Sequence, residues 1–238
     1  MRSRPLAIVV LIATLTFMLS PLLTSGFNGF TADQFLVPQD NPPVQPAGYA
    51  FSIWGLIYLW LLIGAVYGVM RAASDLDWRA MRPPLAISLA LGSFWIKAAN
   101  EAPILATGMI VVMAAAAVVA MLRAGEDRPW LQVRPVALYA GWLTAATGVA
   151  IGVLLGGYGI MSAQAAAIIC LCGVLVVALM VQSARPREWA YPAAVIWALI
   201  GVIVANLPSQ NLVVIALAAL GILSLAGRAG QSLRKGAI

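Results

Sequence analysis

The chain has 238 residues, of which 63% are hydrophobic and 9% are charged. Soluble domains carry about 25% charged residues, so this composition excludes a soluble enzyme and is typical of a protein that is solvated by lipid. The net charge of +6 does not indicate nucleic-acid binding, because the basic residues stand singly or in small groups between apolar runs. The chain has no histidine, which excludes histidine-ligated haem, histidine-based zinc sites and histidine general-base chemistry.

Eight apolar runs meet or approach the length of about 20 helical residues that is needed to cross a bilayer core roughly 30 Å thick. They cover residues 5–24, 47–70, 83–100, 103–123, 134–156, 160–183, 190–207 and 210–227. We therefore predict an all-α, polytopic helical membrane protein with about eight transmembrane helices.

The first run, which follows a basic N-terminus, resembles a signal peptide that would be cleaved near Ser25 and Gly26. Its apolar stretch is longer than the roughly 7–15 residues of a signal peptide, so we predict that residues 1–26 are retained as a transmembrane helix.

Residues 25–46 form the longest connection and hold Asp33, Asp40 and four prolines. Loops of this length are uncommon unless they act as lids or binding segments. Within this loop, residues 31–36 form either a short interfacial helix or part of a plain extended connector.

The basic residues indicate the orientation of the chain. Thirteen of the 14 lie before the first run, after the last run or in alternate connections, all on one side of the membrane, and only Lys97 lies on the other side. The positive-inside rule places that basic side, with both chain termini, in the cytoplasm. We predict an integral protein of a bacterial inner (cell) membrane, with the lipid bilayer as its surroundings and loop 25–46 on the outer side.

All eight acidic residues lie in connections or at the ends of the runs. Ion-coupled carriers usually keep an ionisable group inside the membrane, so this pattern argues against proton-coupled transport and charged-ring channels. The sequence singles out no nucleophile with a base, and we predict that the protein is not an enzyme. Cys170 and Cys172 lie in one apolar run and are interpreted as small apolar residues, not as a disulfide or metal site.

Eight tryptophans are many for this length. Three lie beside cytoplasmic connections and are typical of an interfacial aromatic belt: Trp78, Trp130 and Trp189. Trp54, Trp95 and Trp142 lie deeper and in different runs. They either fill space between helices or give flat surfaces on which a planar ligand could stack.

Two further patterns have a structural and a functional interpretation. Lys97 and Glu101, four residues apart, either pair at the membrane interface or meet a polar group of a ligand. Glycines at four-residue spacing, such as Gly64 with Gly68 and the series from Gly148, allow helices to approach closely. That packing could occur within one bundle or between copies in a homo-oligomer.

The segment PAGYAFSIWGLIY, residues 46–58, keeps Trp54 and Tyr58 at Trp-x-x-x-Tyr spacing. It resembles the start of the second helix in the TspO/MBR family, the tryptophan-rich sensory proteins and the mitochondrial translocator protein (peripheral benzodiazepine receptor). The segment YAGWLTAA, residues 139–146, looks like the fifth-helix motif of that family, and Trp95 looks like its third-helix tryptophan.

The resemblance covers residues 1–156 and implies a TspO-like five-helix bundle with its pocket beneath loop 25–46. Residues 157–238 would add three transmembrane helices and a cytoplasmic tail. The family binds porphyrins and related planar or sterol-like ligands. The resemblance therefore implies a receptor or carrier for a planar hydrophobic small molecule, with no bound cofactor and with a porphyrin or other tetrapyrrole as its ligand.

By the same resemblance, seven residues would line the pocket, and the small Ala146 would leave room for a flat ligand: Tyr49, Phe51, Trp54, Tyr58, Trp95, Trp142 and Ala146. To these predicted ligand-binding residues we add Lys97, which would meet a ligand carboxylate, and Asn100. Two other functions fit the sequence: a transporter of a small organic or lipidic solute, and a structural or assembly subunit held to partners by glycine-lined helix faces.

Overall fold

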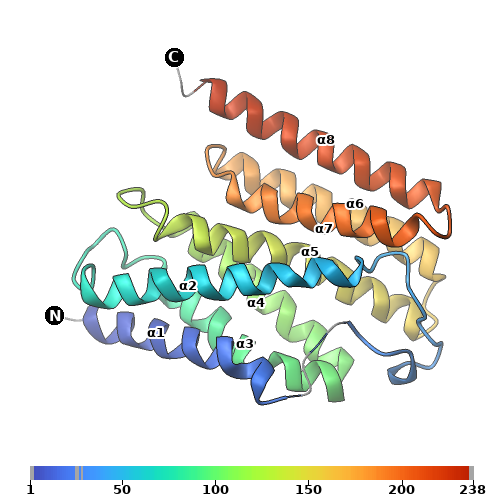
Figure 1. The fold of residues 1–238 in the computed structure, drawn as a ribbon, viewed down its shortest axis with the longest axis horizontal. Coiled ribbons are helices and arrows are strands. Elements are labelled where there is room, and N and C mark those ends of the chain that lie inside the picture. Colours follow the sequence, from blue (N-terminus) through green and yellow to red (C-terminus); the bar gives the residue numbers. More distant parts are fainter. Residues whose placement is uncertain (1–2, 25–26, 28, 236–238) are drawn as a thin grey trace. The chain divides into compact units, whose positions relative to one another are not determined.

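The computed structural model describes residues 3–24, 27 and 29–235, so Ser25 and Gly26, where a signal peptide would be cleaved, lie outside it. The described residues form eight α-helices and contain no strand (Figure 1). The helices are α1 (Ser3–Leu19), α2 (Ile53–Met70), α3 (Arg82–Glu101), α4 (Pro103–Arg123), α5 (Val133–Gly157), α6 (Ala163–Ala184), α7 (Ala190–Asn206) and α8 (Leu212–Lys235). They follow the eight apolar runs, and the predicted all-helical membrane fold is confirmed.

Within the described residues, six helical segments are long and apolar enough to cross a membrane. The two other helices are α3, whose span carries Arg82, Lys97 and Glu101, and α7, which has 17 residues. At 1.5 Å per residue, α7 is about 26 Å long, slightly less than the core of a bilayer. Eight transmembrane crossings would require α3 and α7 to span the membrane as well, and this stays a prediction.

Proline and serine mark where several helices begin. Pro103 starts α4 directly after Ala102, the single residue that joins α3 to α4. Proline suits the first turn of a helix because the N–H that it lacks would have no partner there. Ser162 precedes α6, and its side chain accepts a hydrogen bond of 3.2 Å from the Ala165 N–H.

The chain divides into two compact units, and the division falls inside α5. Unit 1 contains the described residues up to Phe27 together with Ser52–Leu143, and unit 2 contains those of 28–51 together with the residues from Thr144 onward. In unit 1, α1 packs on α2 and α3, and α3 packs along α4; in unit 2, α8 packs on α6 and α7. The predicted domains, 1–156 and 157–238, have a different boundary and stay a prediction.

Glycines allow close helix packing inside both units. A Cβ atom at Gly64 would lie 2.4 Å from the Leu131 carbonyl oxygen, and one at Gly92 would lie 2.6 Å from Cε2 of Phe17. In unit 2, a Cβ atom at Gly148 would lie 2.2 Å from a methyl group of Val174. The small-residue spacings therefore serve contacts within the bundle at these positions.

From residue 29 onward the long predicted loop belongs to unit 2, whereas Phe27 belongs to unit 1. The loop contains one short 3₁₀ turn, η2 (Ala32–Gln34), where the Thr31 N–H donates a 2.9 Å hydrogen bond to Gln34 Oε1. Of the two expectations for residues 31–36, the structure shows a single helical turn. Another 3₁₀ turn, η3 (Gly48–Ser52), leads into α2, which is why α2 begins later than its apolar run.

Candidate ligand site

Five aromatic side chains of unit 1 contact one another, and we call them the aromatic cluster. Helix α1 contributes Phe17, α2 contributes Trp54 and Tyr58, and α5 contributes Tyr139 and Trp142. Residues three or four apart share one face of a helix, so the spacing within α2 and within α5 directs each pair the same way. Three helices therefore bring together rings that are far apart in the sequence.

The rings of the aromatic cluster differ in orientation. Trp54 and Tyr58 stack, with centroids 5.3 Å apart and planes 19° apart. Trp142 meets Trp54 edge to face at 6.1 Å and 84°. Phe17 and Trp54 also meet edge to face, at 5.6 Å and 86°. Both stacked and edge-to-face pairs are favourable for aromatic rings, so the cluster is well packed.

The aromatic cluster consists of three buried side chains, which form its base, and two side chains that are more exposed. Phe17, Tyr139 and Trp142 are buried, with exposed fractions of at most 2%, whereas Trp54 and Tyr58 are only half-buried. The α2 pair is therefore the part of the cluster that a molecule from outside the bundle can reach.

A buried hydrogen-bond chain holds the base in place. The Ser88 hydroxyl donates to the Met113 carbonyl at 2.8 Å, so the Tyr139 hydroxyl, 2.9 Å away, donates to Ser88 Oγ. These two hydrogen bonds connect α5 to α3 and α4. Sequence reasoning did not select Phe17, Ser88 or Tyr139 as site residues, although Tyr139 begins the segment that resembles the fifth-helix motif.

Other predicted site residues of unit 1 lie on α3. The buried indole of Trp95 donates its N–H to the Ala106 carbonyl at 2.9 Å and meets Phe27 edge to face at 4.8 Å. Trp95 therefore ties α3 to α4, and its ring contacts among the described residues are not with the aromatic cluster. Lys97 and Asn100, towards the end of α3, are exposed.

The remaining predicted residues belong to unit 2. Tyr49 is 44% exposed and meets Trp197 of α7 edge to face at 5.6 Å. Phe51 and Ala146 are half-buried, the first at the end of the loop and the second on α5. Of the predicted set, the structure brings Trp54 into contact with both Tyr58 and Trp142 within one unit.

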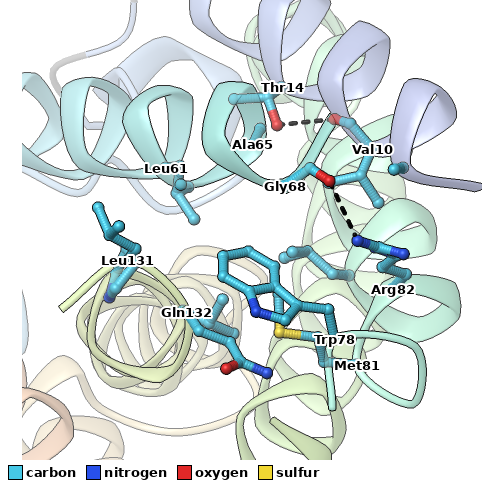
Figure 2. A pocket seen from close by; sticks show the side chains of 15 residues that line it. Val10, Thr14, Leu61, Ala65, Gly68, Trp78, Met81, Arg82, Leu131 and Gln132 are labelled. Carbon is cyan, nitrogen blue, oxygen red and sulfur yellow. Dashed lines mark hydrogen bonds between the residues drawn. The ribbon is translucent and has the colours of Figure 1, made fainter. Parts of the chain in front are cut away.

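Unit 1 also contains a small cavity of about 20 Å³ (Figure 2). Arg82 lines it and donates hydrogen bonds to the carbonyls of Gly68, Ala72 and Ala73, at 3.3, 2.7 and 3.0 Å. The buried guanidinium thus caps the C-terminal end of α2. A space of this size holds about one water molecule, so this cavity cannot hold a tetrapyrrole.

The geometry of the cluster limits how a flat molecule can bind. Tyr58 already stacks on Trp54, so a ligand stacked on Trp54 would lie on the opposite face of the indole. Because the plane of Trp142 is nearly perpendicular to that of Trp54, any contact of the same ligand with the Trp142 ring would be edge to face. The cluster offers apolar and aromatic surface with no charged side chain among its five members.

Fold and cluster together define a polytopic α-helical membrane protein with an aromatic-lined interior. The family model described as TSPO-like protein matches residues 6–228. The chain therefore belongs to the TspO/MBR family, as the resemblance predicted, and the match extends beyond residue 156 through α6 and α7 into α8. No curated protein and no solved structure is similar enough to the chain to match it.

Proposed function

We propose that this protein is a non-enzymatic membrane receptor or carrier for a planar hydrophobic molecule of the tetrapyrrole or sterol-like class. The observation that carries the proposal is the aromatic cluster, in which the half-buried Trp54 and Tyr58 rest on a rigid, buried aromatic base. Ligand pockets are mostly apolar and aromatic with few polar groups, which fits this lining. Membership of the TspO/MBR family supports the same ligand class.

The same proposal includes the placement of the protein. The one-sided distribution of the basic residues supports an orientation with both termini in the cytoplasm of a bacterial cell. Lys97, the single basic residue on the other side, is proposed to meet a carboxylate of the ligand. Tyr49, Phe51 and Ala146 stay predicted contacts.

Titration with protoporphyrin IX tests this function. The purified protein is titrated in detergent, and binding is followed by porphyrin absorbance, which does not depend on the number of tryptophans. Loss of one aromatic contact is worth about 1 kcal/mol beyond buried area, so Trp54→Leu and Trp142→Leu should each weaken binding by roughly fivefold to tenfold.

Trp130→Leu is the matched control. Trp130 is 58% exposed and packs with Trp60 and Arg134, outside the aromatic cluster. Its replacement should leave the affinity unchanged. Equal affinity in the wild type and in both cluster variants would contradict the proposed site.

A further inference from the structure

Unit 2 has a cleft that is independent of the aromatic cluster. It lies where residues 41–48 meet residues 205–211, which are the end of α7 and its connection to α8, and its volume is about 700 Å³. Binding sites for small molecules usually measure roughly 300–1,000 Å³. The cleft is therefore large enough for an organic solute.

The walls of the cleft are held by specific hydrogen bonds. The Ala47 N–H donates to the Gly201 carbonyl at 3.0 Å, and the Asn206 side-chain amide donates to the Pro43 carbonyl at 2.9 Å. Gly201 has to be glycine, because a Cβ atom there would lie 2.8 Å from Cβ of Pro46. Prolines on both sides further restrict the backbone, so the cleft is preformed.

Two residues with unusual backbone conformations belong to the walls or border them. Asn41 has a φ of 51° and Gln210 a φ of 50°, and they are the non-glycine residues of the described chain that have positive φ. Such conformations persist where the surrounding structure holds them, and they concentrate at binding sites. Both lie in the two segments that form this cleft, one in each segment.

The chemistry of the lining favours a neutral polar ligand. Among the described residues that line the cleft, none is charged and none is aromatic. Asn41 and Gln45 provide amide groups, which both donate and accept hydrogen bonds. The Ser209 hydroxyl donates to the Asn206 carbonyl at 3.2 Å and can still accept a hydrogen bond from a ligand. The cleft lacks the flat apolar surface that a tetrapyrrole needs and the charge that an ion needs.

The two helix ends at the cleft carry partial charges of opposite sign. Helix α7 ends at Asn206 with its partial negative charge, and α8 begins at Leu212 with its partial positive charge. Two opposite helix ends give little net preference for an anion or a cation. We propose that this cleft binds a neutral, hydroxyl-rich molecule of the sugar or polyol class, either as a free solute or as the glycosyl headgroup of a lipid.

Trehalose is the probe for a free solute. Its binding is measured by saturation-transfer difference NMR with protein in lauryldimethylamine oxide, because a glycosidic detergent would compete. Lysine and glutamate serve as charged probes. For the lipid source, nanodiscs of phosphatidylcholine with and without monoglucosyldiacylglycerol show whether retained glucolipid copurifies with the protein after transfer to detergent.

Two variants probe the cleft and two are matched controls. Gly48→Phe fills the cleft, because a Cβ atom at Gly48 has no neighbour within 4 Å, and Gly173→Phe is its control at an equally open position outside the cleft. Asn41→Gly removes the amide and keeps the positive φ, and Gln210→Gly does the same at a side chain that does not line the cleft.

The proposal predicts binding of trehalose or retention of the glucolipid, weakened at least fivefold in Gly48→Phe and in Asn41→Gly and unchanged in both controls. Trehalose binding would identify a free solute, and retention of the glucolipid alone would identify a headgroup. If Gly48→Phe does not fold, Asn41→Gly decides. Neither molecule binding, equal binding in the cleft variants, or lysine or glutamate binding as well as trehalose would overturn the proposal.

Discussion

The buried hydroxyl pair beneath the aromatic cluster gives a prediction with a defined asymmetry. Ser88→Ala leaves the Tyr139 hydroxyl, which is fully buried, without its acceptor. Tyr139→Phe removes that hydroxyl, while Ser88 keeps its bond to the Met113 carbonyl. A buried polar group that is left without a hydrogen-bond partner costs more free energy than its removal does. Ser88→Ala should therefore be the more destabilising change.

The magnitude follows from the cost of stranding a hydroxyl. In water-soluble proteins that cost is about 1–3 kcal/mol, and interhelical hydrogen bonds in membranes average about 0.6 and reach about 1.7 kcal/mol. We expect Ser88→Ala to cost about 1.5 kcal/mol and Tyr139→Phe about 0.7 kcal/mol in the free energy of unfolding. The double variant should cost less than the sum, by about 0.7 kcal/mol.

The assay is unfolding by sodium dodecyl sulfate in mixed micelles, followed by circular dichroism. Ser224→Ala is the control, because the exposed Ser224 hydroxyl bonds only within its own helix, to the Leu220 carbonyl. It should change the stability by less than about 0.5 kcal/mol. Additive effects of Ser88→Ala and Tyr139→Phe, or a larger cost for Tyr139→Phe, would refute the proposed direction of the hydrogen bond.

Two further predictions concern packing and capping, and the same unfolding assay checks both. Gly92→Ala places a methyl group against the buried Phe17 ring and should cost about 1–2 kcal/mol, whereas Gly108→Ala, in open space, should be neutral or stabilising by up to about 1 kcal/mol. Arg82→Met removes the charged side chain that caps the end of α2 and should lower the free energy of unfolding by about 2–4 kcal/mol. Arg79→Met, at an exposed position, should lower it by less than about 0.5 kcal/mol. Equal costs within either pair would contradict the contacts described here.

The helices could be predicted from the sequence because lipid makes apolar length the dominant signal. Their ends were less predictable. Helix α8 continues to Lys235, beyond its apolar run, because leaving the hydrocarbon does not end a helix that contains no proline. The distribution of the basic residues predicts an orientation, whereas the charged residues of α3 keep that helix from meeting the apolarity expected of a span.

Three of the five members of the aromatic cluster could be predicted from the sequence. The spacing of Trp54 and Tyr58 places both on one face of α2, and the fifth-helix motif adds Trp142. The contribution of Phe17 depends on how α1 packs against α2 and α3, which no local pattern encodes. A gap at Gly92 that the Phe17 ring fills is visible only in the structure.

Tyr49 and Phe51 show where sequence reasoning could not predict the contacts. Tyr49 and Phe51 lie within the segment that resembles the second-helix motif, yet they belong to unit 2, whereas Trp54 and Tyr58 of the same segment belong to unit 1. The Trp197 N–H donates to the Ala50 carbonyl at 2.8 Å, and Asn206 holds Pro43. From the sequence, Asn206 carried no signal beyond the end of a helix, so these long-range contacts could not be predicted.

A structure of the protein bound to protoporphyrin IX tests the central claim most directly. We predict that the macrocycle lies parallel to the indole of Trp54, on the face opposite Tyr58, at the van der Waals separation of about 3.5–4.0 Å, and meets Trp142 edge to face. A porphyrin bound elsewhere, with no contact to the aromatic cluster, would contradict the account.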